Sequence, residues 1–303
     1  VIVCELNRIS SHLIAVGAMG MDVGATTPFL HAVRDREKIN DLFEMLCGAR
    51  LTYSYIWIGG VSLDAPQAFL DRTKEFLDYV EPKFVEFNQL LTGNKIYVER
   101  LANVGAIGAD DAINFGLVGP NLRACGVNFD LRKDEPYSIY PELEFDVPVG
   151  RGEAGTLGDC FDRYIVRIRE MVESIRIIRQ CLDRIEPGEF RAKMKKKLKP
   201  PPGEVYVRTE APRGEMGYYL VSDGTEKAYR CKIRTGSFSA MNAIPFIARG
   251  WMVADLVAII ASLTSWRRRW IADALGGYHD RAGRREPNAL GRHLSRRPRR
   301  RRR

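Results

Sequence analysis

The stretch that decides the fold runs from Asp159 to Ile185 and reads DCFDRYIVRIREMVESIRIIRQCLDRI. Its apolar residues recur at steps of three or four, which predicts one long amphipathic helix. These positions are Ile165, Ile168, Val172, Ile175, Ile178, Leu182 and Ile185, and arginines fall on the other faces. The acid at its start, Asp159, suits capping, and Pro187-Gly188 is expected to end the helix.

Similar helical patterns lie on both sides of this stretch and favour a helical bundle. The expected ranges are 2–21, 27–48, 65–91, 97–102, 110–115 and 241–263. Thr27 and Pro28 suit a helix start, because threonine caps helices and proline fits the first turn. Pro82 is expected to kink or break the helix over 65–91.

Residues 119–158 lack regular periodicity, yet they are rich in aromatic and apolar side chains. We expect packing to order this irregular segment, because it is too apolar for a solvated linker. Further on, the runs EVYVRTE, MGYYLVSD and KAYRCKIRT are β-branched and aromatic and are separated by turn residues. They predict a small antiparallel sheet.

The predicted fold is therefore mainly α, of the α+β class, with a core of long helices and a small antiparallel β part near the C-terminus. Residues 1–190 are expected to form the helical core, which includes the irregular segment 119–158. A basic and proline-rich linker over 191–203 leads to a small α+β part over 204–263. The arginine-rich residues 264–303 are expected to be disordered.

The formal net charge of +9 comes from the end of the chain. Residues 264–303 hold 14 Arg and no Lys against three acids, so this tail carries +11 and residues 1–263 carry −2. The body is nearly neutral, which argues against a nucleic-acid-binding surface there. Binding of RNA or lipid through the tail remains an alternative to an unstructured appendage.

Six cysteines are scattered along the chain without a CxxC pair, and only four histidines occur, so the sequence holds no zinc-like cluster. Scattered cysteines in a long chain are typical of a reducing compartment. The most apolar run, 252–263, contains Asp255 and is too short to span a bilayer. No signal peptide is visible, and the chain lacks an initiator methionine, so we expect an N-terminal truncation.

A few polar residues are candidates for a functional site. Asp22 lies between two apolar helical patterns and is either a cap or loop acid, or a buried acid with a raised pKa that transfers protons. His12 and His31, each taken alone, suit hydrogen-bonded core or surface positions. Arg123 and Arg132 suit local salt bridges, with an anion site as the alternative.

Eight motifs in order resemble one protein family: ELNRISSHL, TPFLHAVRDREKINDLFE, YIWIGGV, LRACGVNFDLRK, PYSIYPELEFDVPVG, GDCFDRYIVRIREM, PPGEVYVRTEAPRGEMGYYLVSDG and ADLVAIIASL. The family is the D subunit of NADH:quinone oxidoreductase, the 49 kDa subunit family of respiratory complex I. The resemblance spans Val1 to Leu263 and implies a fold like the large subunit of nickel–iron hydrogenase. An active hydrogenase is excluded because its metals need paired CxxC motifs, which this chain lacks.

The resemblance implies a subunit of the hydrophilic arm, peripheral to the cytoplasmic face of the bacterial inner membrane. With the B subunit, which carries the terminal iron–sulfur cluster, it would form the cavity where quinone is reduced and proton pumping is driven. The chain itself is expected to bind no cofactor, whereas the complex uses NADH, FMN, iron–sulfur clusters and a quinone. The expected partners are the B and C subunits and the membrane-arm H and I subunits, with no nucleic acid.

The resemblance also ranks the site residues. Family members hold a His and a Tyr against the quinone headgroup, in a part that precedes the first residue of this chain. Asp22 matches the acid that partners that His, so it is the strongest catalytic candidate. The candidates for the quinone cavity or a subunit interface are His12, Arg50, Arg123 and Arg132.

The chain departs from the family at several positions. Thr52 stands where some members carry a His near the terminal cluster, and Trp57 stands where an Arg is common. The arginine-rich tail replaces an acidic terminal motif. Two alternatives therefore stay open: nucleic-acid binding through the tail, and a structural remnant with no working site.

Overall fold

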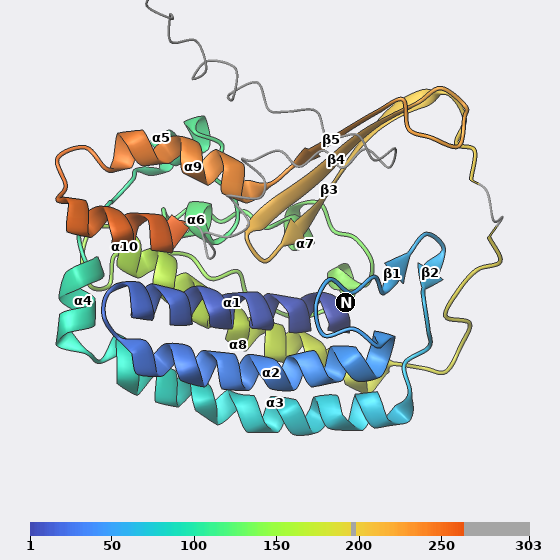
Figure 1. Ribbon diagram of the computed structural model, residues 1–303, viewed down its shortest axis with the longest axis horizontal. Coiled ribbons are helices and arrows are strands. Elements are labelled where there is room, and N and C mark those ends of the chain that lie inside the picture. The colour runs from blue at the N-terminus through green and yellow to red at the C-terminus, as the bar shows by residue number, and fades with distance from the viewer. Residues whose placement is uncertain (195–197, 264–303) are drawn as a thin grey trace, which may run out of the picture. The chain divides into compact units, whose positions relative to one another are not determined.

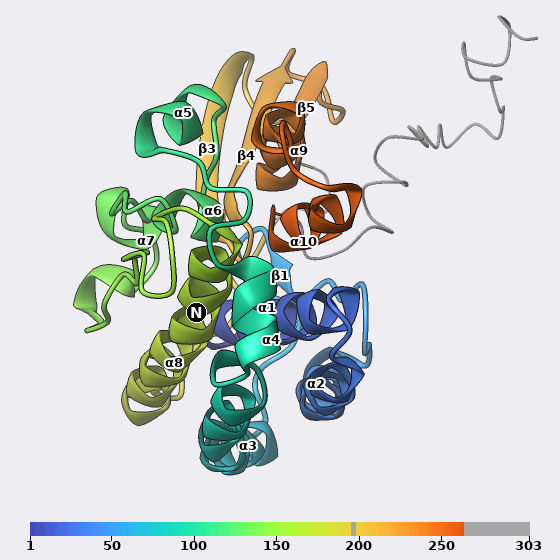
Figure 2. The ribbon, with the colours of Figure 1, turned by 90° about the vertical axis from the view of Figure 1, so that its left-hand side faces the viewer.

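The computed structural model describes residues 1–194 and 198–263, and long helices form the core of this part of the chain (Figure 1). The long helices are α1 (Ile2–Asp22), α2 (Thr26–Cys47), α3 (Gln67–Phe87) and α8 (Cys160–Arg184). α1 packs against α2 and α8, and α3 packs against the same two helices. Figure 2 shows α2 and α3 almost end-on below α1. The predicted mainly α fold with a small β part is confirmed.

α1 forms because its apolar side chains recur with the helical period. Leu6, Ile9, Leu13 and Val16 are all 1% exposed or less, and they face the core of the bundle. The observed helix agrees with the predicted range 2–21 to within one residue. α1 ends at Asp22, which places that candidate at the turn into α2.

Two details of α2 and α3 differ from expectation. The N-cap of α2 is Ala25, so Thr27 lies inside the first turn and does not cap the helix. Pro28 still occupies the first turn, where a missing N–H costs little. α3 does not break at Pro82 but continues for five residues and passes into the π-helix η1 (Asn88–Thr92).

The first part of α8 is buried on every side, from Cys160 to Ile168, and only the later part is amphipathic. Val172 and Ile185, two of the apolar positions in the pattern that predicted this helix, are 44% and 45% exposed. Ile185 already lies past the last residue of the helix. Asp159 is the N-cap and accepts the backbone N–H of residue 162 at 2.9 Å, which confirms the capping interpretation.

The irregular segment 119–158 is ordered by burial. It holds only three short helical turns, α6 (Pro120–Arg123), α7 (Leu131–Asp134) and the 3-10 helix η2 (Tyr140–Glu142). Leu122, Leu131, Tyr140 and Phe145 are nevertheless 6% exposed or less. The prediction that packing orders this segment is confirmed.

The predicted antiparallel sheet is present. Its strands are β3 (Gly203–Ala211), β4 (Gly214–Ser222) and β5 (Arg230–Arg234), in the order β3-β4-β5. The turn from β3 to β4 approaches the start of α6, where Gly119 and Gly214 lie backbone to backbone. A Cβ atom on Gly119 would lie 2.3 Å from Cα of Gly214, so only glycine fits there.

The remaining elements are short. They are α4 (Lys95–Leu101), α5 (Ala109–Asn114), α9 (Gly236–Ile247), α10 (Val253–Leu263) and the hairpin of β1 (Ile56–Trp57) with β2 (Gly60–Val61). The helix predicted over 241–263 is thus two helices, α9 and α10. None of the helices in residues 1–194 and 198–263 has the length and hydropathy needed to cross a bilayer. The division into a core, a linker and a small α+β part stays a prediction, and the predicted disorder of 264–303 lies outside the described residues.

Candidate functional site

Eight charged or titratable side chains from separate elements meet inside the chain. This buried charge cluster comprises Glu5, Arg8, His12, Arg123, Asp130, Arg132, Glu170 and Glu210, each 6% exposed or less. They come from α1, α6, the start of α7, α8 and β3. A charge is tolerated in a protein interior only when it is paired, and every member has a partner within the cluster.

Glu170 on α8 joins two of the predicted site residues. Its Oε1 atom accepts a hydrogen bond from Nε of Arg123 at 2.8 Å and forms an ion pair with Nη2 of the same side chain at 2.7 Å. Its Oε2 atom lies 2.7 Å from Nε2 of His12. An ionised carboxylate can only accept, so His12 carries its proton on Nε2 and donates it to Glu170.

Arg123 is shared among three carboxylates. Besides Glu170, its Nη1 atom lies 3.0 Å from Oε1 of Glu210 on β3 and 3.3 Å from Oδ2 of Asp130. The same nitrogen donates to the backbone carbonyl of Phe129 at 2.9 Å. Arg123 therefore ties α6 to α8, to β3 and to the loop before α7.

The Glu5 carboxylate on α1 accepts hydrogen bonds from four side chains. Arg8 lies 3.1 Å away, Arg132 lies 3.2 Å away, and the hydroxyls of Tyr140 and Ser174 each donate at 2.7 Å. Burial alone would raise the pKa of Glu5, but the two guanidinium groups and the two hydroxyls hold it at about 2. Arg132 also pairs with the carboxylate of Asp130, at 2.7 Å.

The cluster sets the protonation of its members. Burial lowers the pKa of His12 despite the neighbouring carboxylate, so this imidazole is neutral at pH 7. Burial would raise the pKa of Glu170, yet Arg123 and His12 hold it well below its usual range. Burial raises the pKa of Glu210, and the nearby Arg123 offsets this only in part. The pKa values of Glu5, Asp130 and Glu170 are all lowered, so Glu210 is the carboxyl group of the cluster that takes up a proton most readily.

The salt-bridge interpretation of Arg123 and Arg132 is confirmed, although most of the partners are remote in sequence rather than local. Each guanidinium group is enclosed by carboxylates of this chain and is 1% exposed or less. The cluster leaves no excess positive charge for an anion. We therefore interpret it as the joint that fixes α1, α8 and the irregular segment to one another.

Asp22 lies at the opposite end of α1 from this joint. Ten residues separate it from His12, which is roughly 15 Å along a helix axis. Asp22 is half-buried, unlike the cluster, and its neighbour Met21 is 41% exposed. Asp22, the strongest catalytic candidate, therefore lies at an accessible end of α1. The other half of this helix is fixed by the buried charge cluster.

Arg50 lies on the surface, apart from the other candidates. It pairs with Glu37, Asp41 and Glu44 at 2.6, 2.6 and 2.7 Å, and its side chain is 41% exposed. Among the predicted cations it is the one that a neighbouring chain can reach, so its role at a subunit interface stays a prediction.

Two of the departures from the family pattern, Thr52 and Trp57, lie in the region after α2. Thr52 has a left-handed backbone, with φ of 54°, and is exposed. Trp57 lies on the β1–β2 hairpin at 46% exposure, with the Arg191 guanidinium group 4.6 Å from its ring. Both are therefore surface positions in this chain.

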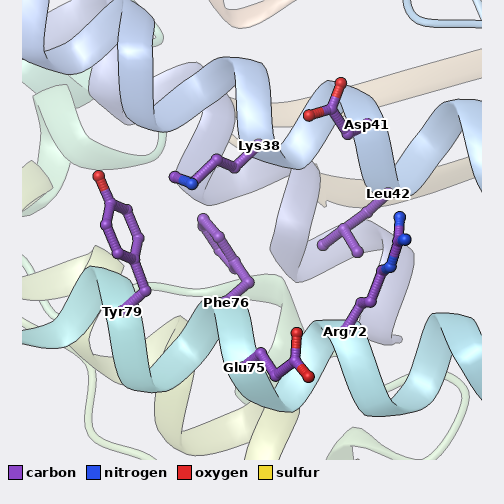
Figure 3. Close-up of a pocket in the computed structure, with 7 residues that line it drawn as sticks. All are labelled: Lys38, Asp41, Leu42, Arg72, Glu75, Phe76 and Tyr79. Carbon is purple, nitrogen blue, oxygen red and sulfur yellow. The ribbon is translucent and has the colours of Figure 1, made fainter.

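A separate pocket lies between α2 and α3 and is lined by Lys38, Asp41, Leu42, Arg72, Glu75, Phe76 and Tyr79 (Figure 3). Three of its polar groups have partners: the Tyr79 hydroxyl donates to Asp35 at 2.9 Å, the Lys38 ammonium lies 4.4 Å from the Tyr79 ring, and Asp41 pairs with Arg50. None of the predicted site residues lines it. Its charged lining does not suit a quinone, which needs an apolar channel.

Sequence reasoning missed Glu5, Glu170 and Glu210, which hold the cluster together. For Glu5 and Glu170 a signal existed, because each falls in step with the buried residues of its own helix. A charged residue in phase with a buried face predicts an internal partner, but the pattern does not name that partner. Among the described residues no group of three or more His, Cys, Asp or Glu side chains is arranged to hold a metal ion.

The chain is similar to one known protein family and to individual members of it. The family described as the 49 kDa subunit of respiratory-chain NADH dehydrogenase matches residues 22–200 and 190–266. A D subunit of the NADH-quinone oxidoreductase of Anaeromyxobacter dehalogenans is 57% identical over 260 residues, which are 86% of this chain and 69% of that protein. A D subunit from Sorangium cellulosum is 56% identical over 265 residues (86% and 68%), and the D subunit from Chlorobaculum tepidum is 52% identical over 267 residues (87% and 67%).

Proposed function

Because the chain belongs to the family of the 49 kDa subunit of respiratory-chain NADH dehydrogenase, we propose that it forms part of the cavity in which that enzyme reduces quinone. The chain is a subunit of an NADH-quinone oxidoreductase, an oxidoreductase complex. The observation that carries the proposal is identity above 50% to D subunits across most of the chain. The other wall of the cavity belongs to the iron–sulfur B subunit.

Asp22 is the residue to which we assign a chemical role. Two-electron reduction of a quinone creates negative charge on its oxygens, which protonatable groups must neutralise. A proton donor has to be reached by substrate or solvent and held in position. Asp22 meets both needs, because it is half-buried at the end of a helix that the buried charge cluster anchors. The members of the cluster itself are too enclosed to meet a substrate.

The surroundings of the proposed site follow from the same assignment. The complex supplies NADH, FMN and the iron–sulfur clusters on other subunits, and the partners are the B, C, H and I subunits. The chain would lie at the cytoplasmic face of the inner membrane, against the membrane arm. Nucleic-acid binding through residues 264–303 falls outside the described residues, and nothing in the described part of the chain favours it.

Asp22→Asn in the assembled enzyme tests the proposal. We expect NADH:quinone activity to fall on the order of tenfold or more, because a positioned proton donor contributes at least that much. NADH:ferricyanide activity should stay unchanged, because those electrons leave before the quinone site. Asp183→Asn, an exposed acid near the end of α8, is the control and should change neither activity.

Two results would refute parts of this assignment. Equal loss of both activities, or loss of neither, would remove Asp22 from the quinone site. Failure of the wild-type chain to co-purify with the B and C subunits would favour the alternative of a structural remnant.

A further inference from the structure

Glu210, near the end of β3, is the carboxyl group through which the three-stranded sheet joins the buried charge cluster. Its Oε1 atom accepts a hydrogen bond from Nη1 of Arg123 at 3.0 Å, and its Oε2 atom accepts one from the backbone N–H of Leu131 at 3.4 Å. The side chain is 1% exposed, so water does not complete these contacts. Within the described part of the chain Glu210 thus has two donors, one of them at a long distance.

The other carboxylates of the cluster have better donors. Glu5 accepts hydrogen bonds from four side chains. Asp130 accepts three from Arg132, through the backbone N–H and two guanidinium nitrogens, at 2.7 to 3.0 Å. Glu170 accepts from a guanidinium group at 2.8 Å and from an imidazole at 2.7 Å. Because donors stabilise a buried negative charge, Glu210 has the weakest support for one.

Nη1 of Arg123 lies near more oxygen atoms than it has hydrogens. It carries two hydrogens, which it donates to Glu210 at 3.0 Å and to the backbone carbonyl of Phe129 at 2.9 Å. Oδ2 of Asp130 lies 3.3 Å from the same nitrogen. Two carboxyl groups that share one nitrogen repel each other when both are ionised, which favours a proton on one of them. Asp130 has Arg132 as its own partner, so the proton belongs on Glu210.

Charged and titratable groups face Glu210 from each element that packs against it. Burial raises the pKa of Glu210, and Asp130 raises it further; Arg123, Arg8 and Arg132 offset this only in part. The pKa of Asp130, in contrast, is lowered to about 2. The groups are Arg8 on α1, Arg123 on α6, Asp130 before α7, Arg132 on α7, Tyr137 after α7, Glu170 on α8 and Glu215 on β4.

We propose that Glu210 is a proton-binding site, and that the proton it binds secures the end of β3 to the helical core. A neutral carboxyl group keeps the hydrogen bond from Arg123 through its carbonyl oxygen. Two further attachments need no charge on Glu210. Arg8 donates to the backbone carbonyls of Glu210 and Ala211 at 3.0 and 3.3 Å, and the backbone N–H of Glu210 donates to the Tyr137 hydroxyl at 3.2 Å.

Loss of the proton should loosen this attachment. It leaves a buried negative charge with too few donors, which is unfavourable. The folded chain binds the Glu210 proton at a higher pH than the unfolded chain, so the stabilisation is present at low pH and is lost as pH rises through the folded pKa. The site is independent of the proposed function, because the isolated chain already contains every group that forms it.

Infrared difference spectroscopy of the isolated full-length chain locates the proton, because a protonated carboxyl group has a carbonyl stretch that an ionised one lacks. At about pH 5.5, roughly one unit above the ordinary pKa of an exposed glutamate, most exposed acids are ionised. Asp159 also has a raised pKa, so the spectrum of Glu210→Gln is subtracted from that of the wild type. We expect the band of a protonated carboxyl group in the difference, and its loss as the pH rises to about 8.

Two infrared results would overturn the proposal. The first is a difference spectrum without the band of a protonated carboxyl group. The second is a band that Asp130→Asn removes and Glu210→Gln leaves in place, because the proton would then belong to Asp130.

Hydrogen exchange of the amides of residues 203–222 tests whether the proton secures the sheet. After correction for the intrinsic exchange rate at each pH, we expect wild-type protection to fall by about fivefold or more between pH 5.5 and 8. Glu210→Gln keeps the shape of the neutral side chain and cannot ionise, so its protection should stay constant over that range.

Glu215→Gln is the matched control. Glu215 lies directly opposite Glu210 on β4, and both residues are 6% exposed. Unlike Glu210, it pairs with two arginines, Arg234 at 2.6 Å and Arg208 at 3.4 Å. We expect Glu215→Gln to lower protection of the sheet at both pH values and to retain the wild-type dependence on pH.

The exchange data can also refute the role of the proton. Wild-type protection that does not change with pH, or a Glu210→Gln variant that keeps the wild-type dependence, would do so. α3 contributes no residue to the cluster and serves as an internal reference. An equal change in the protection of α3 would show that the effect is global. That comparison needs the wild-type chain alone, so it decides the matter if Glu210→Gln does not fold.

Discussion

Replacing Glu170 by Gln should test whether the buried charge cluster holds the helical core together. The change keeps the shape of the side chain and removes one negative charge. Arg123 then loses its closest carboxylate, at 2.7 Å, and His12 loses the ionised acceptor of its Nε2 proton. Both neighbours are 1% exposed or less, so water cannot replace what is lost.

The magnitude follows from what remains around Arg123. Removing one partner of a buried ion pair typically costs about 3–5 kcal/mol. Asp130 and Glu210 still lie within 3.3 Å of Arg123, so we expect the lower end of that range, about 3 kcal/mol. For a body of this size that free energy corresponds to a fall in melting temperature of roughly 6–12 °C.

Glu81→Gln is the matched control. Nη2 of Arg179 lies 2.7 Å from Glu81, the same distance as in the buried pair, but the two side chains are 44% and 51% exposed. An exposed pair contributes about 0–1 kcal/mol, so the control should be nearly neutral. The free energy of unfolding of each full-length variant is measured by urea titration with circular dichroism at pH 7. If the two variants differ by less than about 1 kcal/mol, the cluster does not hold the core and our interpretation of it is wrong.

Two further changes probe the same joint. Burial lowers the pKa of His12 in the folded chain, so the unfolded chain takes up a proton first as pH falls below about 6.5. Wild-type stability, measured by urea titration, should therefore drop between pH 7.5 and 5.5, and His12→Gln should flatten that drop. An unchanged slope in the variant would contradict a neutral buried imidazole. Gly119 has φ of 62° and lies against Gly214, so Gly119→Ala should lower the free energy of unfolding by about 2–3 kcal/mol and lower the melting temperature accordingly. Gly188 has open space around it, so Gly188→Ala should change the free energy of unfolding by less than about 0.5 kcal/mol. Equal effects of the two variants would show that the close approach to Gly214 is not the cause.

The elements of the fold could be predicted where one local signal dominated. α1, α4, α5 and the sheet follow from periodicity, and the predicted boundaries agree with the observed ones to within a few residues. Local patterns say less where tertiary packing decides. Val172 continues the apolar pattern of α8 yet lies outside the buried stripe. Pro82 stays inside a helix, because α3 packs against two others and tolerates the missing hydrogen bond.

The site was harder to predict, because its pairs are remote along the chain. Arg123 meets Glu170 and Glu210 across 47 and 87 residues, and Arg132 meets Glu5 across 127. Periodicity marks such a residue as buried but does not name its partner. Asp22 and Arg50 remain proposals, since the residues of this chain alone do not show what approaches them.

The buried charge cluster also explains which face of the three-stranded sheet lies against the helical core. The sheet turns its polar face inward because Glu210 on that face joins the carboxylates around Arg123. Once that attachment is made, alternation along the strand forces Val205 and Val207 to the other side, into solvent. Loss of Glu210 should therefore weaken the attachment of the sheet to the helical core.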